Sequence, residues 1–87
     1  MIYMENRRSG RLSPREREVF ILAARGLTWR EIAGLLGIAI STVYTYRQRA
    51  LLKLHASCML QGLSLALHQG DIAITDIYPT PDQQIAA

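Results

Sequence analysis

Residues 12–54 read LSPREREVFILAARGLTWREIAGLLGIAISTVYTYRQRALLKL, and the pattern in this stretch decides the fold. It opens with Ser13-Pro14-Arg15-Glu16 and repeats the same device at Thr28-Trp29-Arg30-Glu31. In each motif a hydroxyl residue precedes a glutamate by three positions, the spacing of a capping box, in which both side chains satisfy backbone amides of a first helical turn. Proline also suits the first position of a helix. The two motifs therefore predict helices that begin near residues 14 and 29.

Apolar spacing and glycines indicate how far these two helices extend. The first is expected over residues 14–25 and ends at Gly26, which can adopt the left-handed conformation of a helix end. Its inward-facing residues would be Val19, Leu22 and Ala23, widened by Phe20 and Ile21. The second is short, buries Ile32, Ala33 and Leu36, and stops at Gly37. Residues 37–39 then form a three-residue turn before a third helix, the arrangement of a helix-turn-helix.

The third helix is expected over residues 40–55, because apolar residues recur there at helical spacing. Its core face would consist of Val43, Ala50, Leu51 and Leu54. The outer surface would carry basic, polar and aromatic side chains, namely Ser41, Thr42, Tyr44, Thr45, Arg47, Gln48, Arg49 and Lys53. This segment holds three cations and no acid, which favours contact with a polyanion.

A fourth helix is expected over residues 58–68, with Ser57 as the candidate cap. Its apolar residues exceed what one core face can hide, so some of its leucines should meet a partner. Gly62 lowers the stability of this helix by about 1 kcal/mol relative to alanine, which indicates either a close backbone approach or no structural role. Gly70 ends the helix, and residues 71–78 have the β-branched composition of a short strand.

Length and composition limit the chain to one small domain. Its 87 residues, of which 49% are hydrophobic, suffice for a single core. The expected fold class is all-α, with four helices and a short β-prone C-terminal tail. We expect a flexible basic arm over residues 1–11, the packed domain over 12–70 and the tail over 71–87.

The cations of this chain are placed unevenly. Lysine and arginine number 10 against 7 aspartates and glutamates, and every cation lies at or before Lys53. A basic balance concentrated in one part of a small protein points to a polyanion such as the phosphates of a nucleic acid. The alternative is that these side chains only solvate helix faces, as expected for Arg15 and Arg17.

Several classes of protein are disfavoured by the sequence. No apolar run approaches the roughly 20 residues that cross a bilayer, and the start lacks a signal-peptide pattern, so a cytoplasmic protein without membrane contact is expected. One cysteine, Cys58, cannot form an internal disulfide, and His55 and His68 lack ligand spacing, so no metal or cofactor is expected. No nucleophile with a base, carboxylate pair or glycine-rich phosphate loop is present, so the chain is not expected to be an enzyme.

Residues 12–70 resemble the LuxR-type (GerE-like) helix-turn-helix domain of bacterial transcriptional regulators. The resemblance rests on the order and spacing of LSPREREV (12–19), ARGLT (24–28), EIA (31–33), LGI (36–38), TV (42–43) and KL (53–54). It implies four helices, of which the third lies in the major groove of double-stranded DNA and the fourth commonly serves as the contact of a homodimer.

The resemblance also implies roles for individual residues. Contacts to base edges would come from Tyr44, Thr45 and Gln48. Contacts to the DNA backbone would come from Thr28, Trp29, Thr42, Tyr46, Arg47, Arg49 and Lys53. The dimer interface would involve Leu60, Leu63, Leu65 and Leu67. For Trp29 and Tyr46 the alternative is a packing role at the edge of the core.

The sequence departs from the family pattern at positions that bear on DNA recognition. Ala39 stands where the family usually has a serine that caps the third helix, so the cap is lost there or shifts to Ser41. Tyr44 replaces the usual lysine and Tyr46 the usual histidine. The preferred DNA sequence therefore cannot be taken over from relatives.

Two functions follow as hypotheses. The first is a sequence-specific, double-stranded DNA-binding transcriptional regulator that acts as a homodimer. The second is a protein interaction module that binds RNA polymerase or a separate regulatory protein through the apolar fourth helix and the tail. A promoter-reading domain like that of a sigma factor is closely related, because the helix-turn-helix of those proteins looks similar, but no matching polymerase-binding region precedes it in this sequence.

Overall fold

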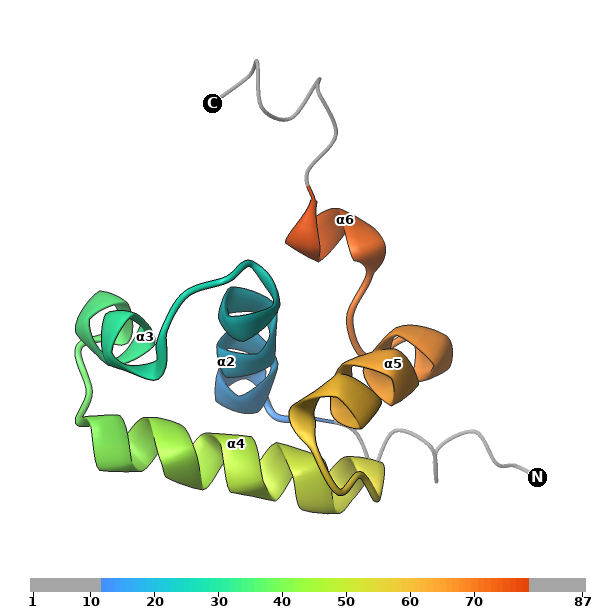
Figure 1. The fold of residues 1–87 in the computed structure, drawn as a ribbon, viewed down its shortest axis with the longest axis horizontal. Helices are drawn as coiled ribbons and strands as arrows, with labels where there is room; N and C mark the ends of the chain where they lie inside the picture. The colour runs from blue at the N-terminus through green and yellow to red at the C-terminus, as the bar shows by residue number, and fades with distance from the viewer. Residues whose placement is uncertain (1–11, 79–87) are drawn as a thin grey trace.

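The computed structural model describes residues 12–78, which fold into helices joined by short loops (Figure 1). These helices are α2 (Pro14–Ala24), α3 (Trp29–Leu36), α4 (Ile40–Leu54), α5 (Met59–Gln69) and α6 (Ile74–Ile77). The long helix α4 contacts α2, α3 and α5, and α6 contacts α2. The all-α fold is confirmed, and no strand occurs within residues 12–78. The basic arm expected over residues 1–11 lies outside the described residues, as do residues 79–87.

Both predicted capping boxes are formed. The Ser13 hydroxyl accepts from the Glu16 amide at 3.2 Å, and the Glu16 carboxylate accepts from the Ser13 amide at 2.8 Å. The Thr28 hydroxyl accepts from the Glu31 amide at 3.1 Å, and the Glu31 carboxylate accepts from the Thr28 amide at 2.8 Å. These reciprocal bonds satisfy amides that an uncapped helix would leave open, and they fix the starts of α2 and α3.

The predicted turn between α3 and α4 is also present. Gly37 ends α3 in the left-handed conformation with φ 70°, which a residue with a Cβ rarely adopts. Ile38 donates its amide to the Ala33 carbonyl at 3.0 Å, and its side chain packs against buried residues of α3 and α4. Ala39 is the N-cap of α4 and provides no side-chain hydrogen bond, so the cap is lost there and does not shift to Ser41.

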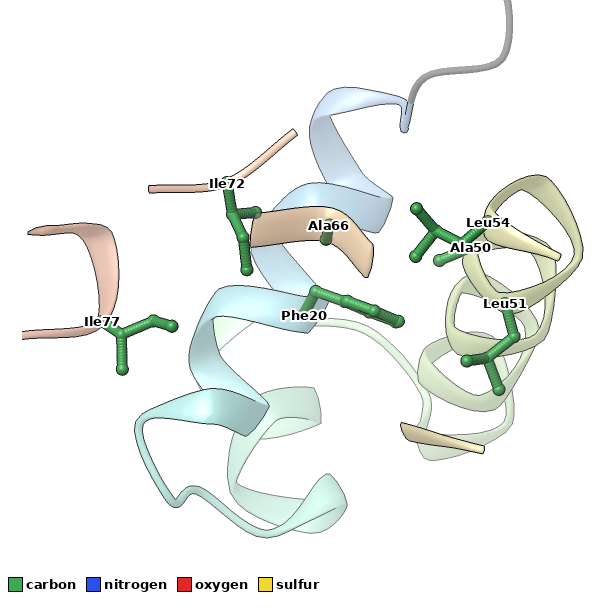
Figure 2. Packing of buried hydrophobic residues seen from close by; sticks show 7 residues of the cluster. All are labelled: Phe20, Ala50, Leu51, Leu54, Ala66, Ile72 and Ile77. Atoms are coloured by element: carbon green, nitrogen blue, oxygen red, sulfur yellow. The ribbon is translucent and has the colours of Figure 1, made fainter. Parts of the chain in front are cut away.

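Two clusters of buried side chains hold the helices together. The turn cluster consists of Val19, Ile32, Ala33 and Val43, and it joins α2 to α3 and α4. The C-terminal cluster consists of Phe20, Ala50, Leu51, Leu54, Ala66, Ile72 and Ile77. Figure 2 shows Phe20 projecting from α2 toward α4, with Ile72 and Ile77 approaching from the opposite side. The core face predicted for the third helix is therefore correct.

Gly62 lies where α5 packs closely against side chains of α4 and α2. A Cβ at this position would lie 2.8 Å from Leu51 Cδ2 and 3.1 Å from Phe20 Cε2 and Cζ. Gly62 is buried between α4 and α2, so the close backbone approach is the correct reading of this glycine. The N-cap of α5 is Cys58 rather than the expected Ser57, whose amide and hydroxyl instead donate to the Gln61 side chain.

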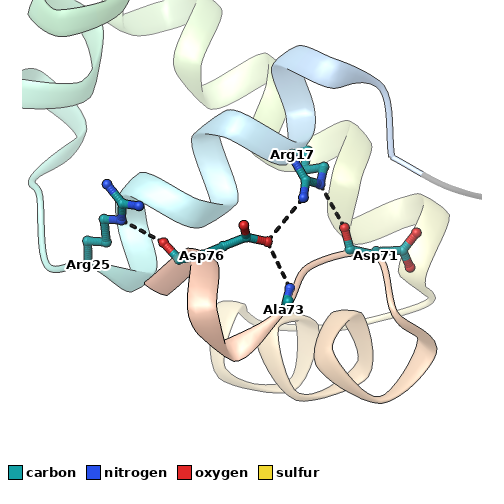
Figure 3. Close-up of polar contacts among 5 residues, drawn as sticks. All are labelled: Arg17, Arg25, Asp71, Ala73 and Asp76. Carbon is teal, nitrogen blue, oxygen red and sulfur yellow. Dashed lines mark hydrogen bonds and ion pairs between the residues drawn. The ribbon is translucent and has the colours of Figure 1, made fainter. Parts of the chain in front are cut away.

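The strand expected over residues 71–78 is wrong, because this segment forms the helical turn α6. The Asp76 carboxylate accepts from the Ala73 amide at 2.9 Å and caps that turn. Arg17 of α2 donates to the Asp71 carbonyl at 2.9 Å and to the Asp76 carboxylate at 3.0 Å, and Arg25 donates to the Asp76 carbonyl at 2.8 Å (Figure 3). Arg17 is exposed, as expected, and it also tethers this segment to α2, which the sequence did not predict. We call residues 71–77 the C-terminal strap.

Candidate nucleic-acid interface

The outer surface of α4 exposes the side chains predicted to contact DNA bases. Tyr44, Thr45 and Gln48 are all exposed, and Tyr44 and Gln48 share one face because they are four positions apart on the helix. The Thr45 hydroxyl donates to the Ser41 carbonyl at 3.1 Å, which leaves its lone pairs and its methyl group for an external partner. Gln48 carries both a donor and an acceptor. This face can therefore form directional hydrogen bonds and apolar contacts.

The residues predicted to contact the DNA backbone differ in how far they are exposed. Thr28 and Arg49 are exposed, whereas Trp29, Thr42, Tyr46 and Arg47 are half-buried. Trp29 and Tyr46 both pack against the turn cluster, so each takes the packing role that the sequence left open as an alternative. Half-burial leaves part of each side chain accessible.

Trp29 joins the start of α3 to the outer surface of α4. Its ring meets the Tyr44 ring edge-on, with centroids 6.3 Å apart and an interplanar angle of 69°. The Arg47 guanidinium carbon lies over the Trp29 ring, 5.6 Å from its centroid, in cation–π geometry. The Arg47 Nε is buried and has no hydrogen-bond partner. We call Trp29, Tyr44 and Arg47 the aromatic bridge.

Lys53, also predicted as a backbone contact, is exposed and forms an ion pair with a buried carboxylate of the protein. Its ammonium lies 2.8 Å from Oε1 of Glu16, whose side chain is only 4% exposed. Burial alone would raise the pKa of the Glu16 carboxyl, but hydrogen bonds from Lys53 and from the Ser13 amide outweigh it, so the pKa lies below its ordinary value of 4.5. The pair connects the first turn of α2 to the last turn of α4.

Hydrogen bonds and ion pairs determine which cations remain available to an external anion. Protein acceptors engage Arg15, Arg17, Arg25 and Lys53. Within residues 12–78, Arg30, Arg47 and Arg49 have neither an ion pair nor a hydrogen bond to the protein. All three lie on the helix-turn-helix formed by α3 and α4. Within residues 12–78, the cations that no protein acceptor engages are therefore confined to this helix-turn-helix.

Arg30 is a candidate that the sequence analysis missed. It is exposed in the first turn of α3, directly after Trp29. A cation at that end of a helix opposes the helix dipole, so it destabilises the helix slightly unless an anion lies nearby. That unfavourable placement is the signal in the sequence that could have identified it.

The four leucines predicted for a dimer interface differ in exposure. Leu60 is 80% exposed, whereas Leu63, Leu65 and Leu67 are half-buried and pack against the C-terminal cluster. Much of the apparent surplus of apolar residues in α5 is thus absorbed by the core of this chain.

Residues 12–78 contain neither a cluster of metal-binding side chains nor a single helix that could span a membrane. No group of three or more histidine, cysteine, aspartate or glutamate side chains comes together there as a metal site. No single helix there is long and apolar enough to cross a bilayer, and α4 and α5 reach that length and composition only as a pair bent by 58°.

Comparison with known families identifies the helix-turn-helix. Residues 7–54 match the family described as Sigma-70, region 4. The chain belongs to the sigma-70 region 4 family. The match ends at the last residue of α4, so in this sigma-70 region 4 domain the helices α5 and α6 lie beyond the family match. The expectation of a helix-turn-helix DNA-binding domain is confirmed at this coarser level.

Curated relatives of this sigma-70 region 4 domain are transcriptional regulators. The chain is 41% identical over 66 residues to the HTH-type quorum sensing-dependent transcriptional regulator VjbR of Brucella ovis, and equally to those of Brucella abortus and Brucella melitensis. The aligned region covers 76% of this chain and 26% of each relative. The chain therefore spans about a quarter of the length of these regulators. No solved structure gives a significant match.

Proposed function

We propose that this chain is a sequence-specific, double-stranded DNA-binding transcriptional regulator of the LuxR type, with α4 in the major groove. The observation that carries the proposal is the outer surface of α4, which exposes Tyr44, Thr45 and Gln48 beside arginines that no protein acceptor engages. A major groove about 12 Å wide admits one helix, whose polar side chains can then reach base edges. Similarity to regulators named VjbR supports the same function.

In this proposal the base contacts specify the sequence and the backbone contacts fix the register. Gln48 can bind an adenine through two hydrogen bonds, and Tyr44 can pack on sugar or on a thymine methyl while its hydroxyl forms a hydrogen bond. Phosphate contacts come from Arg47, Arg49 and the missed candidate Arg30. The remaining backbone contacts are those implied by the family resemblance, namely Thr28, Trp29, Thr42, Tyr46 and Lys53.

Lys53 differs from the other proposed backbone contacts, because its ammonium already binds Glu16. An ammonium carries three N–H donors, so it can bind Glu16 and a phosphate together. Replacing Lys53 would therefore weaken both DNA binding and the fold, and the residue is unsuitable for separating the two effects.

We further propose that two copies bind DNA as a homodimer through α5. The exposed Leu60 would be the centre of that contact, with Leu63, Leu65 and Leu67 at its edge. A two-fold dimer would place two α4 helices in successive major grooves, about 34 Å apart, and would select an inverted-repeat site.

The salt dependence of DNA binding tests the main proposal. Sites would first be selected from a random duplex library, and affinity for the best site would then be measured against salt concentration. The logarithm of affinity should fall linearly with the logarithm of salt concentration, and the slope should become shallower by about 0.9 for each phosphate contact removed by Arg49→Ala or Arg30→Ala. Arg15→Ala is the matched control, since Arg15 pairs with Glu18 on α2. A slope near zero, or no binding at low salt, would overturn the proposal.

The exposed Leu60 also favours a second candidate function, binding of RNA polymerase or a separate regulatory protein through α5. Ile72 and Ile77 of the C-terminal strap are buried in the core, so these two residues are not available to such a partner. The combination of Arg30→Ala, Arg47→Ala and Arg49→Ala separates the two functions. If regulation in cells survives this triple variant and is lost in Leu60→Glu, the second candidate holds and the first fails.

A further inference from the structure

We infer that Trp29 is a positioning residue for DNA recognition, whose ring sets the orientation of both Tyr44 and Arg47. The inference rests on the proposed function, in which Tyr44 contacts a base and Arg47 a phosphate. This role differs from a direct contact between the indole and a phosphate. Here the Trp29 ring acts through two side chains of another helix, α4.

The aromatic bridge provides the geometry. Tyr44 and Arg47 are three residues apart on α4, so they lie on the same side of the helix. The Trp29 and Tyr44 ring centroids lie 6.3 Å apart in an edge-on arrangement. The Arg47 guanidinium carbon lies 5.6 Å from the Trp29 ring centroid. Because Trp29 also packs against the turn cluster, its ring is anchored to the core of the helix-turn-helix. The two side chains are thus held from one fixed point.

Arg47 depends on this ring for its orientation. No hydrogen bond holds its guanidinium, and its Nε is buried without a partner. An arginine tethered by a carboxylate would have part of its charge neutralised, whereas stacking on an aromatic face leaves the charge intact. The terminal nitrogens therefore stay available to a phosphate oxygen while the side chain has already lost much of its rotational freedom. Ordering of this kind before binding raises affinity by about 2- to 10-fold per side chain.

The Trp29 ring also restricts the orientation of the Tyr44 side chain. Tyr44 is exposed, yet the edge-on contact with Trp29 restricts the directions in which its hydroxyl can point. A base contact is selective only when its donor or acceptor is held in place, so Trp29 influences sequence preference without touching a base. The Trp29 ring on α3 then couples the base contact of Tyr44, which specifies the DNA sequence, to the phosphate contact of Arg47, which fixes the register.

Affinity and selectivity measurements on variants of the whole chain test this inference. Trp29→Leu keeps an apolar side chain in the turn cluster but removes the aromatic face, and Trp29→Phe keeps a smaller face. Leu36→Ala is the control, since Leu36 packs against the same cluster and takes no part in the aromatic bridge. Trp29→Leu should lower affinity by about 5- to 10-fold and broaden base preference at the position under Tyr44, whereas Leu36→Ala should change stability only.

A double-mutant cycle distinguishes positioning from general packing. If Trp29 acts through Arg47, Trp29→Leu should lower affinity much less in an Arg47→Ala background than in the unmodified chain. Additive effects, or a loss in Trp29→Leu that matches Leu36→Ala, would overturn the inference while leaving the proposed function intact. If the unmodified chain does not bind duplex DNA with a salt-dependent affinity, both are overturned.

Fluorescence gives a second measurement that needs no change to Trp29. The sequence contains a single tryptophan, so tryptophan emission reports on the surroundings of Trp29, which include Tyr44 and Arg47. Tyr44→Ala and Arg47→Ala should each shift that emission, and bound duplex should shift it in the unmodified chain. Emission unchanged by all three would contradict the bridge even if Trp29→Leu does not fold.

Discussion

The Lys53 ammonium lies 2.8 Å from a Glu16 carboxylate that is almost completely buried and that also caps α2. The Glu16 side chain thus caps the start of α2 and also holds the end of α4 through Lys53. This arrangement makes Glu16 a structural centre of the domain, and its partners can be tested separately.

Replacing Lys53 with methionine should destabilise the domain by about 1–3 kcal/mol, because Lys53→Met leaves a buried carboxylate without its charged donor. Arg15→Met is the matched control, since the Arg15–Glu18 pair is exposed and should contribute less than about 1 kcal/mol. Urea unfolding followed by circular dichroism measures both. Equal losses in the two variants would show that the Glu16–Lys53 pair has no special role.

The stability of the domain should depend on pH through Glu16. Its pKa is lower in the folded state than its ordinary value of 4.5, so the folded state favours the charged carboxylate. The resulting stabilisation is fully present above pH 4.5 and is lost as the pH falls through the lower, folded pKa. Glu16→Gln should therefore flatten the fall in unfolding free energy below pH 4.5. An unchanged acid profile in this variant would refute the assignment.

Gly62→Ala and Gly34→Ala should have opposite effects on stability. Both exchanges favour a helix by about 1 kcal/mol through propensity. At Gly62 the new Cβ would meet Leu51 and Phe20 in a packed core, so overpacking of about 1–3 kcal/mol should outweigh that gain. At Gly34 nothing lies within 4 Å, so the variant should be stabilised. Thermal unfolding of the two variants measures the difference, and a stabilised Gly62→Ala would refute the close approach of α5.

The C-terminal strap should contribute to global stability. Ile72→Val shortens a side chain that is only 2% exposed, and it should cost about 1 kcal/mol. Ile74→Val makes the same change at a residue that is 56% exposed, and it should cost less than about 0.5 kcal/mol. Chemical unfolding of both variants gives the comparison. Equal effects would indicate that the strap does not belong to the cooperative core.

Local patterns in the sequence predicted the helix-turn-helix well. Capping boxes depend on residues three positions apart, and the core face of α4 depends on spacing within one helix, so both can be read without knowledge of the fold. The left-handed glycine at Gly37 is a local requirement of the same kind. These signals fixed the starts of α2 and α3 and the turn that leads to α4.

Features that depend on distant residues could not be predicted. The β-branched residues of 71–78 suggested a strand, but bonds from Arg17 and Arg25 hold this segment as a helical turn against α2. The pairing of Glu16 with Lys53 spans 37 residues, and it removed Lys53 from the cations that are free. The aromatic bridge likewise combines residues of two helices. The DNA contacts themselves stay predictions, as does the homodimer.

The neighbouring residues Val19 and Phe20 belong to different clusters, so α2 contributes to both the turn cluster and the C-terminal cluster. Val43 of α4 belongs to the turn cluster, whereas Ala50, Leu51 and Leu54 of α4 share the C-terminal cluster with α5 and the strap. Residues 57–78 should accordingly be exchangeable for those of another helix-turn-helix protein, provided that the graft packs against Phe20, Leu51 and Leu54. Under the proposed function, such chimeras should keep the DNA sequence preference of this chain and take the assembly of the donor protein.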